Sequence, residues 1–221
     1  MKMFRNRLSI IVSLLLPLAA SACSHNTGET RQEEVEAVAV ADSAQEPVTV
    51  RPVAALPDKP TGTAFIVVSK RDETLSVYDL DTAGDTVMVT QFPCCMGKNK
   101  GNKVKRGDMR TPESPAGKPF KITMIQDAST WHHDFGDGRG SIKAYGHWFL
   151  RLDTPGHKGI GIHGSTNNEN TVPGRASEGC IRLLDKDIIT LKEHFAYVGM
   201  PVIVQAEGQA PQPWELRARG Q

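Results

Sequence analysis

The chain has little net charge and no long apolar run. Its 26 Lys and Arg residues are balanced by 25 Asp and Glu residues, which leaves a net charge of +1. This balance gives no reason to expect nucleic-acid binding. The apolar run at residues 8–20 is too short to span a bilayer comfortably. No internal repeat is apparent, so we expect an ordinary single domain.

The chain also has few cysteines. There are four, and two of them, Cys94 and Cys95, are adjacent. Side chains of adjacent residues point to opposite faces of a strand, so a disulfide between these two would be strained. We expect both to be free, or one of them to be buried.

The sequence carries no recognisable metal motif. It has neither a Cys-x-x-Cys pair nor the helical His-Glu-x-x-His spacing of zinc hydrolases. Its loop histidines leave a zinc hydrolase as an alternative that metal analysis would test; these are His132, His133, His147 and His157. We expect no metal and no cofactor.

Residues 1–23 have the anatomy of an export signal. Basic residues precede the apolar run, and small residues precede Cys23. This ending resembles a bacterial lipoprotein cleavage site, with Cys23 as the lipidated first residue. Cleavage by ordinary signal peptidase near Ala22 is the alternative. We therefore expect an exported, periplasmic protein that is anchored to a membrane through a lipid at Cys23.

The rest of the chain divides into three segments of different composition. Residues 24–60 hold seven acidic and three basic residues and no aromatic residue, with several prolines near the end. Such a segment cannot bury enough apolar surface to offset its chain entropy, so it is predicted to be a disordered tether. Residues 61–206 are long enough for one domain with its own core. Residues 207–221 are predicted to be a flexible tail.

Alternating apolar residues predict a mostly β domain with one late helix. The expected strands lie at residues 65–69, 75–80, 87–92, 120–124, 141–152, 159–163 and 201–204. The helix is expected at residues 185–197, with Asp185 as its N-cap. Residues 127–140 are long enough to form a flap over an active site. The basic run at residues 97–110 is expected to be a mobile hairpin tip, or alternatively a loop attracted to an anionic polymer.

The chemistry is concentrated in two short motifs that contain His163 and Cys180. A thiolate is the nucleophile in thiol-based acyl transfer, and a nearby imidazole makes it available. Gly179 leaves room for a substrate carbonyl and lets consecutive N–H groups point at an oxyanion. The alternative is that Cys180 is an inert core cysteine.

These motifs resemble the signature of the L,D-transpeptidase (YkuD-like) catalytic domain. The matching residues are His163, Gly164, Ser177, Gly179, Cys180, Ile181 and Arg182. The resemblance extends over about residues 65–204 and implies an antiparallel β-sandwich or barrel-like fold with one late α-helix. Glu178 departs from the pattern, because the family usually has a second histidine there.

The resemblance implies a role for each matched residue. Cys180 would be the nucleophile and His163 the base, with the Gly164 carbonyl orienting the His163 ring. The N–H groups of Gly179 and Cys180 would bind the oxyanion. Tyr145 and His147 fall in a region that lines the substrate cleft in the family, although Tyr145 could instead pack in the core.

Two further residues have alternative interpretations. Arg182 could clamp a substrate carboxylate or form a structural ion pair with Asp185 or Asp187. Ser177 could help hold the thiolate loop and contact substrate, or be a simple turn residue.

The resemblance implies cysteine-dependent acyl transfer on peptidoglycan stem peptides, which cross-links the cell wall through a thioester. A hydrolase of the same fold is an alternative: an L,D-carboxypeptidase, an endopeptidase, or an enzyme that releases protein from the wall. A lipid-anchored wall-binding module without catalysis is an alternative of another class.

Overall fold

A computed structural model describes residues 56–220 of the chain. The predicted export signal, the predicted lipidation site Cys23 and most of the predicted tether at residues 24–60 lie outside these residues. Within residues 56–220, no helix is long and apolar enough to cross a bilayer.

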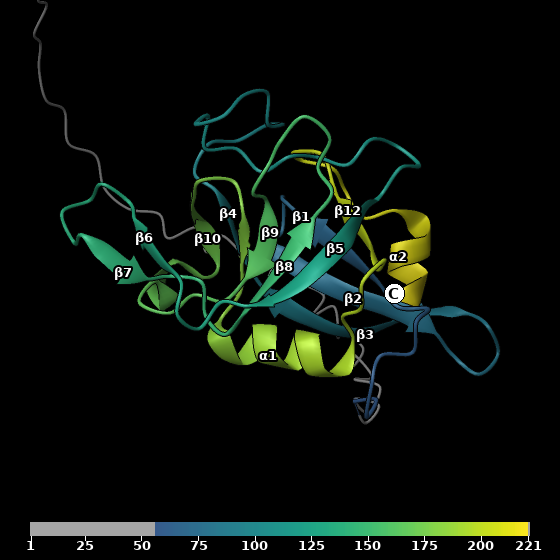
Figure 1. Ribbon diagram of the computed structural model, residues 1–221. Coiled ribbons are helices and arrows are strands. Elements are labelled where there is room, and N and C mark those ends of the chain that lie inside the picture. Colours follow the sequence, from purple (N-terminus) through teal and green to yellow (C-terminus); the bar gives the residue numbers. More distant parts are fainter. Residues whose placement is uncertain (1–55, 221) are drawn as a thin grey trace, which may run out of the picture. The chain divides into compact units, whose positions relative to one another are not determined.

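Ten strands form one large sheet in the order β10-β4-β11-β9-β8-β5-β12-β1-β2-β3 (Figure 1). They are β1 (Phe65–Ser69), β2 (Thr74–Leu80), β3 (Thr86–Pro93), β4 (Cys95–Gly97), β5 (Phe120–Asp127), β8 (Trp148–Leu152), β9 (Gly161–His163), β10 (Gly174–Ser177), β11 (Ile181–Arg182) and β12 (Pro201–Val204). A separate hairpin and three helices complete the fold: β6 (His132–Asp134), β7 (Ser141–Lys143), η1 (Glu169–Thr171), α1 (Asp185–His194) and α2 (Pro213–Ala218). The mostly β class is confirmed.

The sheet is mixed rather than wholly antiparallel. Most neighbouring strands run antiparallel, but β1 and β12, β4 and β10, and β9 and β11 pair in parallel. The last of these pairs sets the positions of the two predicted catalytic residues.

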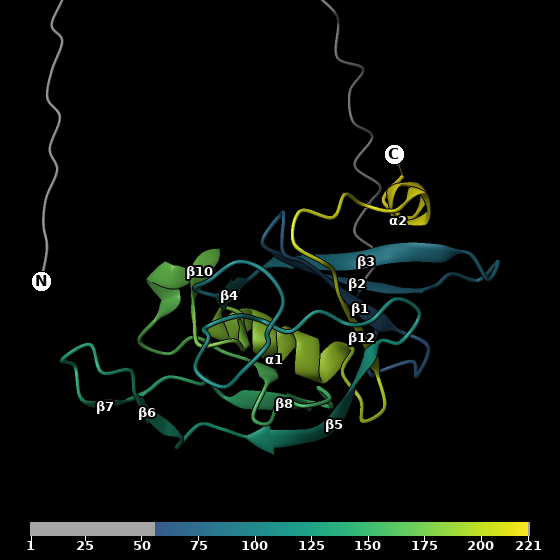
Figure 2. The same cartoon turned by 90° about the horizontal axis from the view of Figure 1, so that it is seen from above.

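Strand β1 is buried on both faces, which explains its continuous apolar sequence. Ile66 and Val68 belong to the main core, while Val67 packs in a second cluster with Tyr78 and Ala218. Successive side chains of a strand point to opposite faces, so β1 serves both clusters. Helix α1 lies inside the curl of the sheet, and α2 covers the outer face near β3 (Figure 2).

Helix α1 begins at Asp185, but the prediction that Asp185 caps it is wrong. Leu184 is the N-cap and makes no side-chain capping bond. The Asp185 carboxylate turns away to accept hydrogen bonds from the Ser165 N–H at 2.7 Å and from the Thr166 hydroxyl. The carboxylate therefore ties the loop after β9 to the start of α1, and α1 ends at His194 rather than at residue 197.

Within the predicted tail, the structure has a second α-helix, α2, which the sequence did not predict. Helix α2 begins with Pro213 and is stabilised by a reciprocal capping box between Gln212 and Glu215. Its Trp214 ring packs against Phe65 and Tyr78 with ring centroids 5.8 and 5.3 Å apart. This burial of aromatic surface orders the segment.

Candidate active site

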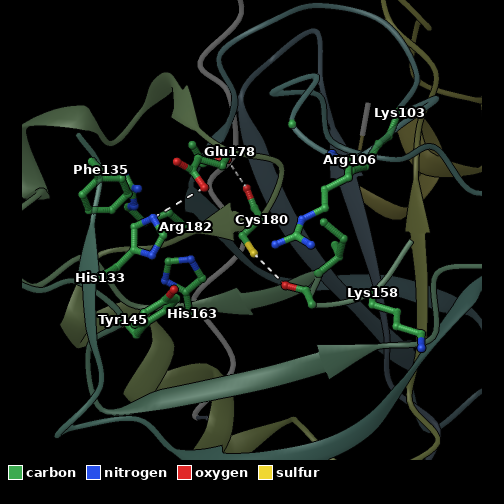
Figure 3. A pocket seen from close by; sticks show the side chains of 14 residues that line it. Lys103, Arg106, His133, Phe135, Tyr145, Lys158, His163, Glu178, Cys180 and Arg182 are labelled. Atoms are coloured by element: carbon green, nitrogen blue, oxygen red, sulfur yellow. Dashed lines mark hydrogen bonds and ion pairs between the residues drawn. The ribbon is translucent and has the colours of Figure 1, made fainter. Parts of the chain in front are cut away.

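Strands β9 and β11 bring His163 and Cys180 to one pocket. They pair in parallel, with Arg182 opposite His163 and Ile181 opposite Ile162. Cys180 directly precedes β11 and lies two residues before the position opposite His163, so the two side chains point to the same face of the pair. Both residues line a pocket of about 250 Å³ (Figure 3). The thiol of Cys180 is partly exposed and donates to the Gly159 carbonyl at 3.5 Å.

The His163 ring is buried and its orientation is fixed from three sides. Its Nδ1 lies 2.7 Å from the Gly164 carbonyl oxygen. A carbonyl oxygen can only accept, so Nδ1 carries the proton and Nε2 is left as the acceptor. The ring also stacks on Phe149 and contacts Tyr145, with centroids 5.7 and 4.9 Å apart. The Gly164 carbonyl thus has the geometry expected for orienting the imidazole.

Burial keeps both groups of the pair neutral. It lowers the pKa of His163 to about 3, and the neighbouring Arg182 cation acts in the same direction. Burial also raises the pKa of the Cys180 thiol, although Arg182 and Lys103 oppose that shift. Both shifts favour the uncharged forms, a thiol beside a neutral imidazole.

This neutral pair predicts the pH dependence of alkylation. Iodoacetamide reacts with the thiolate, and the Cys180 pKa is raised, so the alkylation rate should climb continuously from about pH 5 to pH 9. His163, with its pKa lowered to about 3, stays uncharged over this range and adds no inflection. Mass spectrometry of the Cys180 peptide after timed quenching measures the rate. A plateau below neutral pH would instead reveal a preformed thiolate–imidazolium pair.

The turn before Cys180 is held by Ser177, and this corrects one prediction. The Ser177 hydroxyl donates to the Cys180 carbonyl at 2.6 Å and accepts from the Gly179 N–H at 3.1 Å. The Gly179 N–H is therefore occupied and is not free to bind an oxyanion as predicted. Gly179 has φ +133°, and a Cβ there would lie 2.7 Å from the Arg110 carbonyl oxygen. Glycine is thus needed for the close approach of the loop that contains Arg110.

That loop, within residues 97–110, is folded over the site rather than projecting as a mobile tip. Lys103 is buried and pairs with Asp108, whose carboxylate oxygen is 2.8 Å away. The same carboxylate accepts from the Val104 and Lys105 N–H groups at 2.7 and 3.0 Å. Lys103 and Arg106 therefore line the pocket, as does Lys158 from the loop before β9. Sequence reasoning missed these three cations as site residues.

Comparison with known families decides the identity of the domain. Residues 63–204 match the family model of the L,D-transpeptidase catalytic domain, YkuD. The chain belongs to this family. No curated protein is significantly similar to it in sequence.

Several solved structures are similar to this L,D-transpeptidase family chain. Bd1075 of Bdellovibrio bacteriovorus is 20% identical, with 70% of this chain and 53% of that chain covered and a TM-score of 0.46. An L,D-transpeptidase from Mycobacterium smegmatis is 22% identical, with 65% and 58% covered and a TM-score of 0.43. The helical cell shape determining protein Pgp2 from Campylobacter jejuni is 19% identical, with 71% and 52% covered and a TM-score of 0.47. The match thus spans 52 to 58% of these solved chains.

Among the predicted substrate residues of this L,D-transpeptidase domain, Tyr145 lines the pocket but His147 does not. The Tyr145 ring contacts His163, and burial raises the pKa of its hydroxyl. His147 is exposed and lies outside the pocket wall. Strand β8 begins directly after His147. The prediction that His147 binds substrate is therefore not supported by its position.

Arg182 forms part of the pocket wall, and the alternative of an ion pair with Asp185 or Asp187 is wrong. Its guanidinium donates to the Thr171 hydroxyl at 2.7 Å and has no acidic partner among residues 56–220. Its Nε has no hydrogen-bond partner among the same residues. The side chain is only 2% exposed, so it places a desolvated positive charge beside Cys180.

The predicted flap is the β6–β7 hairpin, and it reaches the pocket. His133 and Phe135 from this hairpin line the wall beside Tyr145. His133 Nε2 lies 3.4 Å from a carboxylate oxygen of Glu178, the residue that replaces the usual histidine (Figure 3).

The remaining cysteines and histidines form no further site within the described chain. Cys94 and Cys95 are both buried and free, as predicted. Residues 56–220 contain no group of three or more His, Cys, Asp or Glu residues arranged to hold a metal ion.

Proposed function

We propose that this chain catalyses acyl transfer on peptidoglycan stem peptides, with Cys180 as nucleophile and His163 as general base. The observation that carries the proposal is the pairing of β9 with β11, which puts both side chains in one pocket with the His163 Nε2 left as an acceptor. Membership of the L,D-transpeptidase family supports the choice of substrate.

The first half of the reaction forms a thioester. His163 Nε2 takes the proton from the Cys180 thiol, and the sulfur attacks the carbonyl carbon of an L-to-D peptide bond in a tetrapeptide stem. A C–S bond forms and the carbonyl oxygen becomes an oxyanion, which the Cys180 N–H would stabilise. When the C–N bond breaks, His163 gives its proton to the leaving amine, and D-Ala departs.

The second half transfers the acyl group. An amine from a second stem attacks the thioester carbon, so that a C–N bond forms and the C–S bond breaks. His163 takes a proton from the attacking amine and returns it to sulfur. Water in place of the amine would give hydrolysis, which is the alternative reaction of the same site. The buried guanidinium of Arg182 is proposed to attract a substrate carboxylate toward this reaction centre.

The cellular setting is part of the proposal. Export by residues 1–23 and lipidation at Cys23 would place the domain in the periplasm, anchored to a membrane and near its polymer substrate. The acidic segment at residues 24–60 would then set the reach of the domain from the membrane.

The test is product analysis with a disaccharide tetrapeptide. Mass spectrometry should detect loss of D-Ala and a cross-linked dimer from the wild-type chain, and neither product from Cys180→Ala, because the variant lacks the attacking sulfur. Thermal unfolding of both proteins controls for folding.

The other outcomes separate the alternatives. Release of D-Ala with tripeptide alone would identify an L,D-carboxypeptidase. No Cys180-dependent change in the stem peptide would contradict the proposal and favour a wall-binding module.

A further inference from the structure

Among the described residues that line the pocket around Cys180, Glu178 is the one acidic side chain. Four of the described residues that line it carry a positive charge: Lys103, Arg106, Lys158 and Arg182. Lys103 is paired with Asp108, and the Arg182 guanidinium carbon lies 5.8 Å from the centroid of the Phe135 ring. Lys103, Arg106 and Lys158 lie on one side of Cys180, whereas His133 and Tyr145 lie on the other (Figure 3). Glu178 stands at the mouth, toward the aromatic side.

The Glu178 carboxylate approaches one charged or polar side chain and is otherwise exposed. Its Oε2 is 3.4 Å from His133 Nε2. The His133 ring in turn packs against Phe135 and Tyr145, with centroids 4.5 and 6.2 Å apart. Among residues 56–220, Glu178 makes no other ion pair or side-chain hydrogen bond, and its side chain is 47% exposed. A carboxylate oxygen therefore faces solvent at the entrance to the reaction centre.

We propose that Glu178, oriented by His133, binds the ammonium group of the acyl acceptor on the aromatic side of Cys180. This inference rests on the proposed acyl transfer and specifies its second substrate as a cationic amine. An alkylamine is an ammonium ion near neutral pH and must be attracted before it loses its proton. Among the described residues that line the pocket, Glu178 is the one carboxylate and therefore the position that attracts such a group.

The same geometry favours transfer over hydrolysis. The charge of the Glu178 carboxylate attracts an ammonium ion more strongly than neutral water, so Glu178 raises the local concentration of the amine next to the thioester. The bound ammonium releases one proton to solvent, and the neutral nitrogen attacks the thioester carbon. The C–N bond forms, the C–S bond breaks, and the second proton passes through His163 to the Cys180 sulfur.

The experiment measures partition of the acyl group between an amine and water. The full chain is given a tetrapeptide donor with increasing glycinamide, which is cationic near neutral pH, or hydroxylamine, which is largely uncharged there. Mass spectrometry gives the ratio of amide or hydroxamate to tripeptide. Glu178→Gln is expected to lower the ratio with glycinamide about tenfold at subsaturating acceptor, by raising the KM for that amine. The ratio with hydroxylamine should fall far less.

Two further variants make the result specific. Glu178→Asp keeps the charge and should recover part of the glycinamide ratio. Glu193→Gln removes an exposed carboxylate on α1, outside the pocket, and should match wild type. If the wild-type chain acylates glycinamide and Glu178→Gln gives the same ratio, the inference is overturned while the proposed function stands. If the wild-type chain forms no Cys180-dependent product, the proposed function itself is wrong, and the inference falls with it.

Discussion

Replacing His163 with glutamine is expected to slow formation of the Cys180 thioester by about 100- to 10,000-fold, the range of a general base. The reason lies in the neutral resting pair. The pKa of the Cys180 thiol is raised by burial, so little thiolate exists until an adjacent group takes the proton. His163 Nε2 is the acceptor oriented for this, because Nδ1 is bound to the Gly164 carbonyl.

Single-turnover mass spectrometry of the acyl-enzyme with a tetrapeptide donor measures this rate. His132→Ala is the matched control, because His132 is exposed in the β6–β7 hairpin and does not line the pocket. A thioester rate in His163→Gln within threefold of wild type would contradict a base role for His163. Unfolding curves of both variants separate lost chemistry from lost folding.

Gly146→Ala is expected to lower the free energy of unfolding by about 3 kcal/mol, and the melting temperature by about 6–12 °C. Gly146 has φ +67°, and a Cβ there would meet the Asp185 carboxylate and lie 2.6 Å from the Gly164 Cα. The backbone after β7 passes directly over the loop that follows His163. Neither backbone can move without disturbing the Asp185 bonds that tie this loop to α1.

Gly117→Ala is the control for Gly146→Ala. Gly117 has φ +68°, almost the same backbone conformation, but nothing lies within 4 Å of the added Cβ. It should show only the left-handed strain of about 1 kcal/mol. Differential scanning calorimetry of both variants separates the steric destabilisation from the backbone strain. Equal shifts in melting temperature would mean that the backbone contact between Gly146 and Gly164 tolerates an added Cβ.

The sequence predicted the strands that show an apolar pattern within their own residues. Strands β1, β2, β3 and β12 lie within a residue or two of the expected positions, because each carries a run of β-branched or alternating apolar residues. The very short strands β4, β10 and β11 were missed. They are too short to show periodicity, and only pairing with distant segments makes them strands.

The predicted site shows the same division between local and distant information. His163 and Cys180 could be paired from sequence because both lie in short motifs and their strands are neighbours in the sheet. The sequence could not assign Lys103, Arg106 and Lys158 to the site, because they enter the pocket from loops whose path depends on tertiary contacts. One sequence feature could have indicated Lys103. Asp108 follows five residues later, and its carboxylate forms an ion pair with Lys103 that closes the loop.

The N-cap of α1 and the presence of α2 were both missed, and for the same reason. Asp185 is a good capping residue by type, yet its carboxylate accepts hydrogen bonds from Ser165 and Thr166, 20 and 19 residues earlier in the chain. Helix α2 follows a polar stretch, yet Trp214 finds an aromatic surface on β1 and β2. In both places a long-range contact overrode the local propensity that the prediction used.

A cysteine that is protonated at rest is also chemically protected. Oxidation to sulfenic acid begins from the thiolate, so a thiol whose pKa is raised by burial reacts slowly with peroxide. The same desolvation that would make Cys180 depend on His163 for activation thus slows the first step of oxidation at this sulfur. A standing thiolate in this position would react faster with an acyl donor and also faster with peroxide.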